Sequence, residues 1–217
     1  MGRVDAPKAA IFDLDGTLVD SFDLVVLAFA KACREYLGRD LSREEVISRF
    51  GVTEVQMLRR ELPASHHERA IAILRQCYAE NHQRLVKVFV GIPEMLDALR
   101  KRGIPMGVMT AKGRDTADIT LRELGWTNFF GSVVTGDEAK RTKPFPDGPL
   151  QVAAELGMAA EDCIFVGDAP ADIGAGKAAG MKTVWAAWHP VYEEKVTALK
   201  PDVIAHSPSE VVRLFEL

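Results

Sequence analysis

Short apolar segments alternate with helical segments after about residue 89 of this 217-residue chain, and this alternation is the feature that most constrains its fold. Strands are expected at residues 8–13, 105–110, 132–136, 162–168, 182–187 and 202–206, and helices at 93–102, 114–124, 145–156 and 172–179. Strands separated by helices of this length are joined by right-handed crossovers in a parallel sheet. The pattern therefore predicts an α/β fold, a Rossmann-like parallel sheet with helices on both faces.

Residues 20–84 interrupt this alternation, because they show helical periodicity and no convincing strand. Between Phe22 and Leu37 the apolar side chains fall on one helical stripe. Capping boxes, in which Ser or Thr is followed three positions later by Glu or Gln, predict further helix starts at Ser42, Thr53 and Ser65. The first strand must join the same sheet as the later ones, so the helical segment is an insertion. The predicted division is a core of residues 1–17 and 86–217 and an inserted all-helical domain of residues 18–85.

Charge and hydropathy exclude several classes of protein. With 27 basic and 31 acidic side chains the formal net charge is −4, which argues against a general binder of nucleic acid or anionic membranes. The longest stretch without a charged side chain, residues 124–136, is too short to cross a bilayer. Residues 1–10 contain no apolar signal core, and three widely spaced cysteines indicate neither a disulfide framework nor a zinc knuckle. We therefore expect a cytoplasmic protein with no nucleic-acid or membrane partner.

Polar side chains gather where four of the predicted strands end. The candidates are Asp13 and Asp15 after the first strand, Thr110 after the second, Lys143 beyond the third, and Asp168 and Asp172 after the fourth. Each alone is typical of a turn or a helix cap. Because the carboxyl ends of parallel strands meet at one edge of a sheet, we expect these side chains to lie together in one site.

The charges of these side chains indicate what the site binds. Four carboxylates in one crevice cannot all stay ionised and desolvated without counter-charge. A divalent cation together with Lys143 would offset three of the four charges. Magnesium suits such a site, because it takes one or two carboxylates and keeps waters that a phosphate can replace. Thr110, Lys143 and loop amides would then accept a phosphate group, so the site predicts phosphoryl chemistry.

The ordered set of motifs resembles the haloacid dehalogenase superfamily, and in particular its small-molecule phosphatases of the phosphoglycolate phosphatase type. The set consists of Asp-x-Asp-Gly-Thr at 13–17, Thr at 110, Lys-Pro at 143–144 and Gly-Asp-x-x-x-Asp at 167–172, with the helical insertion after the first motif. The resemblance covers essentially the whole chain. It implies magnesium-dependent hydrolysis of a small phosphorylated metabolite, a phosphomonoester, through an aspartyl-phosphate intermediate.

The resemblance also implies a role for each carboxylate. Asp13 would be the nucleophile, and Asp15 would protonate the leaving oxygen and then deprotonate the hydrolytic water. Asp13, the backbone carbonyl of Asp15 and Asp168 would hold Mg²⁺, with Asp172 orienting the ligands.

By the same resemblance, Thr110, the backbone amide at Ala111 and Lys143 would bind the phosphoryl oxygens. Members of the family often carry Asn or Ser where this chain has Ala111. The backbone amide is then the group expected to matter at that position.

The helical insertion would be a mobile cap that closes over the site and contacts the leaving group. Its hinges are expected near residues 17–20 and 85–90. Arg49, Gly51 and Thr53 lie in a helix–helix connection where the family often places cap residues that face the site.

Several alternatives share these core residues. A β-phosphoglucomutase-like phosphomutase is one, although Thr17 favours hydrolysis, and a pyrophosphatase of the same clade is another. A phosphate-sensing binding module is the non-enzymatic alternative, but inactive relatives typically lose a carboxylate that this chain keeps at Asp13, Asp15 and Asp168. Haloalkanoate dehalogenation has no use for a magnesium cluster. Monomer and homodimer are both compatible with the sequence.

Overall fold

The computed structural model describes residues 6–189 and 191–216. Predictions for residues 1–5, which include the start of the predicted core and half of the segment searched for a signal core, lie outside the described residues. Six described strands form one sheet in the order β5-β4-β1-β6-β7-β8, with every neighbouring pair parallel. They are β1 (Ala9–Phe12), β4 (Met106–Met109), β5 (Ser132–Val134), β6 (Cys163–Gly167), β7 (Lys182–Ala186) and β8 (Val203–Ala205). The predicted Rossmann-like α/β fold is confirmed.

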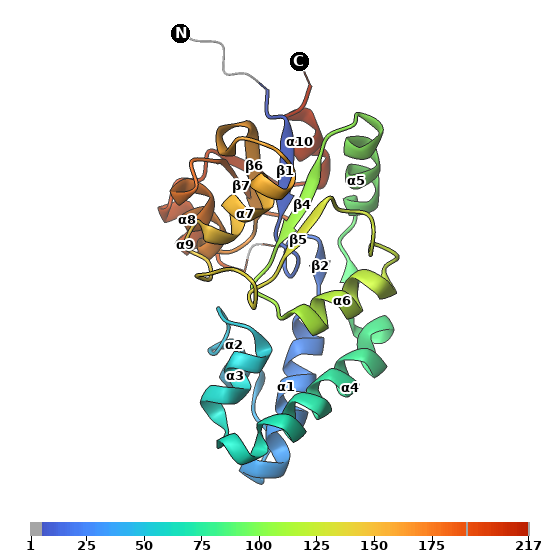
Figure 1. The fold of residues 1–217 in the computed structure, drawn as a ribbon, viewed down its shortest axis with the longest axis vertical. Coiled ribbons are helices and arrows are strands. Elements are labelled where there is room, and N and C mark those ends of the chain that lie inside the picture. Colours follow the sequence, from blue (N-terminus) through green and yellow to red (C-terminus); the bar gives the residue numbers. More distant parts are fainter. Residues whose placement is uncertain (1–5, 190, 217) are drawn as a thin grey trace.

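Helices cover both faces of the sheet (Figure 1). They are α5 (Ile92–Lys101), α6 (Arg114–Glu123), α7 (Asp147–Glu155), α8 (Pro170–Ala178), α9 (Glu193–Ala198) and α10 (Pro208–Arg213). Successive residues of β1 point to opposite faces. Ala10 and Phe12 join the apolar cluster with α5, α6 and α10, whereas Ala9 and Ile11 join the cluster with α7 and α8. Burial on both faces explains why the strands are continuous apolar runs.

Residues 22–85 are helical, as predicted, and lie at one end of the molecule, beyond the sheet (Figure 1). The helices are α1 (Phe22–Leu37), α2 (Arg43–Ile47), α3 (Glu54–Glu61) and α4 (His67–Leu85), with a 3₁₀ turn at Ala64–His66. α1 and α4 pack along one another, and α2 and α3 pack against α1. Phe29 of α1, Leu58 of α3 and Leu74 of α4 are fully buried. Across residues 6–189 and 191–216, no helix is both long and apolar enough to span a bilayer.

Two of the three predicted capping boxes are confirmed. Ser42 and Thr53 each cap a helix, and the Glu45 or Gln56 side chain bonds back to the capping residue. The prediction at Ser65 is wrong, because this residue lies inside the 3₁₀ turn and its hydroxyl pairs with His66 Nδ1 at 3.1 Å. α4 therefore begins at His67 without a side-chain cap.

The insertion joins the core through two chain segments that pair with each other. β2 (Val19–Asp20) and β3 (Lys87–Val88) form a short antiparallel ladder at the positions of the predicted hinges. The loop after β7 touches both segments. Trp188 Nε1 donates a hydrogen bond to the Thr17 carbonyl (3.0 Å), and the His189 ring lies 5.2 Å from the ring centroids of both Phe22 and Phe89.

Candidate active site

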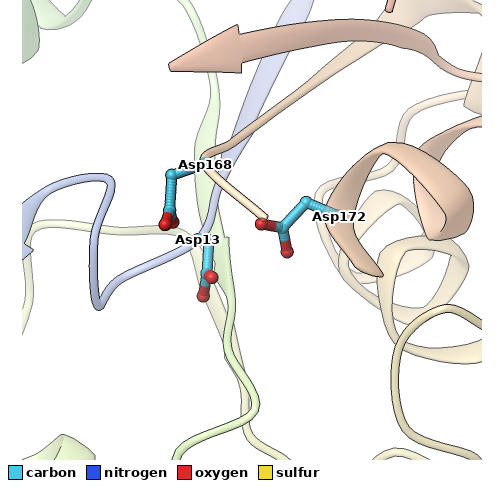
Figure 2. Close-up of side chains that lie close together, drawn as sticks. All are labelled: Asp13, Asp168 and Asp172. Atoms are coloured by element: carbon cyan, nitrogen blue, oxygen red, sulfur yellow. The ribbon is translucent and has the colours of Figure 1, made fainter. Parts of the chain in front are cut away.

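Three aspartates converge at the carboxyl edge of the sheet (Figure 2). Asp13 follows β1 and Asp168 follows the adjacent strand β6, while Asp172 projects from the first turn of α8. One carboxylate oxygen of each lies within 4.8 Å of those of the other two, and all three residues are buried. The predicted convergence of strand-end carboxylates thus follows from the pairing of β1 with β6.

Glycines allow the backbone to approach these carboxylates closely. A Cβ on Gly16 would lie 2.4 Å from an Asp168 carboxylate oxygen, and one on Gly167 would lie 2.3 Å from the Asp172 Cβ. Gly16 also has a φ of +85°, a conformation that favours glycine. The Thr17 hydroxyl donates to Asp168 Oδ1 at 3.1 Å. The loop after β1 is therefore shaped around Asp168 as well as Asp13.

Lys143 is buried against two of the three aspartates. Its Nζ lies 2.9 Å from Asp13 Oδ2 and 2.6 Å from Asp172 Oδ1. Burial raises the pKa of the Asp13 carboxyl to about 7, against the opposing effect of the Lys143 ammonium. Burial alone would lower the pKa of Lys143, but the charges of Asp13 and Asp172 raise it above its usual range. Lys143 therefore remains a cation and favours the ionised form of its partners.

The cluster fits a divalent cation. Burial raises the pKa values of Asp168 and Asp172, and a single ammonium offsets only one of the three negative charges. Asp168 Oδ2 is buried and has no hydrogen-bond partner among the described residues, since His189 Nδ1 lies 4.0 Å from it, beyond hydrogen-bond distance. Such an oxygen is costly unless something positive binds it. Oxygen donors from carboxylates are the ligands that Mg²⁺ prefers.

The groups predicted to bind phosphate lie beside this cluster. Thr110, at the end of β4, is buried, and its hydroxyl oxygen accepts a hydrogen bond from the Lys112 amide (3.2 Å). Its own O–H is thereby left as a donor. Thr110, Ala111 and Lys143 line the same cavity as Asp13. The structure therefore brings together all three predicted phosphate contacts.

Asp15 lies on the cavity wall but outside the aspartate cluster. Its carboxylate accepts hydrogen bonds from the Ser21 hydroxyl and from Lys112 Nζ, the latter at 2.9 Å. Lys112 Nζ also lies 3.1 Å from Glu54 Oε1 of α3. Sequence patterns predict no role for Lys112 or Glu54. Lys112 could have been found from its position directly after Thr110 and Ala111 at a strand end. Glu54 could not, because an acidic residue in the first turn is typical of any helix.

A cavity of about 450 Å³ separates the cluster from the helical insertion. The insertion contributes Phe22, Val25, Ile47, Ser48, Phe50, Gly51, Val52, Glu54 and Met57 to its lining.

Of the three predicted cap contacts, Gly51 lines this cavity, and Arg49 and Thr53 are not part of the lining. Arg49 Nε donates to Glu61 Oε2 at 2.8 Å, which holds the guanidinium within the insertion. Thr53 is fully buried, and its hydroxyl oxygen caps α3 by accepting a hydrogen bond from the backbone amide of Gln56.

Comparisons with known proteins agree with this geometry. The model of the haloacid dehalogenase-like hydrolase family matches residues 10–186. A pyrophosphatase of Bacillus velezensis is 32% identical over 206 residues, covering 95% of each chain. A phosphoglycolate phosphatase of Aquifex aeolicus is 32% identical over 209 residues, covering 96% of this chain and 97% of the relative.

The fold has close counterparts among solved structures. A predicted phosphoglycolate phosphatase of Haemophilus somnus superposes with a TM-score of 0.84 and covers 96% of this chain and 98% of its own, at 24% identity. At that identity the likeness shows the fold alone. The family match over most of the chain, together with full-length relatives above 30% identity, shows that this chain belongs to the haloacid dehalogenase-like hydrolases.

Proposed function

We propose that the protein is a magnesium-dependent phosphatase that hydrolyses a small phosphomonoester through an aspartyl-phosphate on Asp13. The observation that carries this proposal is the buried cluster of Asp13, Asp168 and Asp172, in which Lys143 bridges Asp13 and Asp172 and all three aspartates line one cavity. A carboxylate next to a cation remains ionised and can act as a nucleophile. The names of the relatives support hydrolysis of a phosphate compound.

The proposed reaction has two displacements at phosphorus. An Asp13 carboxylate oxygen attacks the phosphorus, the bond to the leaving oxygen breaks, and Asp15 gives that oxygen a proton. A water then attacks the phosphorus of the acyl phosphate, Asp15 takes a proton from the water, and the Asp13 carboxylate is released with inorganic phosphate. Thr110, the Ala111 amide and Lys143 donate to the phosphoryl oxygens, on which negative charge builds up.

Asp13, the backbone carbonyl of Asp15 and Asp168 would hold Mg²⁺, with Asp172 orienting the site. When bound, the ion offsets the charge of the phosphoryl group and of the carboxylates around it. Lys143 already supplies one positive charge to Asp13 and Asp172.

We also propose that residues 18–85 act as a cap and that residues 1–17 and 86–217 form the catalytic core. The β2–β3 ladder is the only strand pairing between the two crossing segments in the described chain. Two residues per strand give a narrow connection, which suits a hinge. The cavity between the insertion and the aspartates is then the space that the cap closes.

The mostly apolar cap side of the cavity favours a monoester with a small leaving group. Of the lining residues contributed by the described insertion, only Ser48 and Glu54 are polar, and none is cationic. Lys112 contacts the carboxylates of both Glu54 and Asp15 and offsets part of their charge, and Lys195 of the core also lines the cavity. Pyrophosphate is the second candidate substrate, because some relatives are pyrophosphatases. Its second phosphate would lie against this mostly apolar wall.

Phosphate release with Mg²⁺ across a panel of small phosphate compounds tests the proposal. The panel contains 2-phosphoglycolate, pyrophosphate, sugar phosphates, short alkyl phosphates and nucleotides, with Asp13→Asn as the blank. We expect one or a few monoesters to react far faster than pyrophosphate. Fastest release from pyrophosphate would make the protein a pyrophosphatase. Conversion of β-glucose 1-phosphate to the 6-phosphate without release would make it a mutase, and no reaction would favour a binding module.

A further inference from the structure

Glu54 belongs to the helical insertion, but every polar contact recorded for its carboxylate is with the core. Oε2 accepts a hydrogen bond from the Gly113 amide at 3.0 Å, and Oε1 accepts one from the Thr116 hydroxyl at 3.0 Å. Oε1 also lies 3.1 Å from Lys112 Nζ. Only 7% of the Glu54 side chain is exposed. A buried carboxylate is costly without partners, so these three contacts hold the insertion against the core.

Gly113 explains why a carboxylate from another element is accommodated here. It is the N-cap residue of α6, and its own backbone amide, which has no acceptor within the helix, donates to Glu54 Oε2, whereas the next amide, of Arg114, donates to Asp137 at 2.9 Å. Glu54 thus supplies an acceptor from α3 for one of the free amides at the end of α6 that favours negative charge. This interaction exists only while the insertion is docked on the core.

Lys112 extends the contact to the proposed acid–base residue. Its Nζ lies 2.9 Å from Asp15 Oδ2 as well as 3.1 Å from Glu54 Oε1, and its side chain is fully buried. The ring of Tyr78, from α4 of the insertion, lies 4.8 Å from the same ammonium. Two residues of the insertion therefore fix the lysine that fixes Asp15. If the insertion moves away, Lys112 loses both of these contacts.

We propose that Glu54 is a positioning residue that seats Lys112 against Asp15 when the cap docks, so that the acid–base carboxylate is correctly placed only in the closed protein. This inference rests on the proposed function, because it assigns Asp15 the proton transfers. It gives the cap a part in the chemistry beyond enclosing the leaving group. The coupling is reciprocal, since the same contacts that place Asp15 also stabilise the docked cap.

The first test compares Glu54→Gln with Glu61→Gln. Both glutamates lie on α3, one at each end, but Glu61 pairs with Arg49 inside the insertion. Amide hydrogen exchange is measured by mass spectrometry on the peptide that covers residues 110–120. We expect Glu54→Gln to speed exchange at and after Gly113 by about tenfold or more, with Glu61→Gln unchanged. Equal exchange in the two variants overturns the docking role, whether or not the protein turns over any ester.

The second test uses the leaving group, because a purely structural role would not depend on it. A short alkyl phosphate needs a proton on its leaving oxygen, whereas p-nitrophenyl phosphate releases a stable anion. kcat/KM reports the steps up to departure of the alcohol. We expect Glu54→Gln to lower kcat/KM for the alkyl ester at least about tenfold more than for the p-nitrophenyl ester. We expect Glu54→Asp, which keeps the charge, to recover part of this difference.

The outcomes separate the inference from the proposed function. Equal losses of kcat/KM for both esters, or no loss for either, overturn the link from Glu54 to Asp15 while leaving the phosphatase proposal standing. A wild-type protein that releases phosphate from neither ester overturns the proposed function and the acid–base part of the inference together. Thermal unfolding of each variant verifies that Glu54→Gln is folded at the assay temperature.

Discussion

At the scale of single residues, the proposed chemistry depends on the balance of charge between Lys143 and the buried aspartates. Lys143 contacts Asp13 and Asp172, and the Asp168 carboxylate oxygen Oδ2 is left without a hydrogen bond from the described residues. Neutralising Asp13 leaves Lys143 paired with Asp172, so this change should affect the chemistry more than the fold.

Asp13→Asn should abolish turnover while leaving the fold intact. The amide has the size of the carboxylate but cannot attack phosphorus, so phosphate release should fall below about one thousandth of the wild-type rate. Phosphate release and circular dichroism measure the two effects. Residual turnover above that level, in a protein freshly purified and free of deamidated product, would remove Asp13 from the role of nucleophile.

Gly16→Ala should lower turnover by about a hundredfold, because a displacement of 1 Å at reacting groups can cost that much. Its Cβ would lie 2.4 Å from the Asp168 carboxylate, so the loop or the aspartate must move. Gly38→Ala is the matched control. Gly38 also has a positive φ, of +66°, but its Cβ would meet nothing within 4 Å in the described structure. It should cost about 1 kcal/mol of stability and no activity. Similar activity in both variants would contradict the crowding argument.

At the scale of whole elements, α4 of the insertion packs against α6 of the core. Tyr78, fully buried on α4, and Thr120, fully buried on α6, share a hydrogen bond of 2.9 Å between their hydroxyls. Burial raises the pKa of the Tyr78 phenol to about 12, which keeps it neutral and able to donate. α4 thus contacts the core along α6 as well as through the β2–β3 ladder.

A double-mutant cycle should detect this bond. Tyr78→Phe and Thr120→Val each remove one hydroxyl with little change of volume, so each should lower the free energy of unfolding by about 1 kcal/mol. Because each single variant strands the partner's hydroxyl, the double variant should lose less than the sum of the two losses. Urea unfolding of the four proteins gives the coupling energy. Strict additivity would show that the two hydroxyls do not interact in solution.

At the scale of the whole molecule, the candidate site lies between a parallel-sheet core and an all-helical insertion. The parallel sheet directs its carboxyl ends toward the helical insertion (Figure 1). Residues of both parts line the cavity. Each side contributes different chemistry to the cavity. The core supplies the aspartates and Lys143, and the insertion supplies a mostly apolar wall.

Binding of Mg²⁺ should stabilise the whole protein and be required for activity. At a magnesium concentration one hundred times its Kd, the folded state gains about 2.7 kcal/mol. For a chain of this length that corresponds to a rise in Tm of about 5 °C or more. Calorimetry with MgCl₂, against KCl of equal ionic strength, measures this rise, and Asp168→Asn should abolish it. Full phosphate release in excess EDTA would rule out the metal-dependent mechanism.

The elements that could be predicted from the sequence are those specified by local patterns. The strands and the helices between them follow from apolar runs and helical periodicity, and the capping boxes at Ser42 and Thr53 follow from short-range hydrogen bonds. The ladder of β2 and β3 and the helices α9 and α10 were not predicted, because they are too short for a periodic signal. Ser65 has the same pattern as the two true caps, but its hydroxyl pairs with a neighbouring ring.

By itself the sequence determined the fold class, the insertion and the strand-end carboxylates, because neighbouring parallel strands bring their carboxyl ends together whatever the packing around them. Only the tertiary structure decided which side chains of the insertion reach the site. Arg49 pairs with Glu61 inside the insertion, while Glu54 reaches Lys112 across the interface. These contacts depend on how rigid elements far apart in the chain pack and on where buried charges find partners. Residue spacing within one segment carries no information about either.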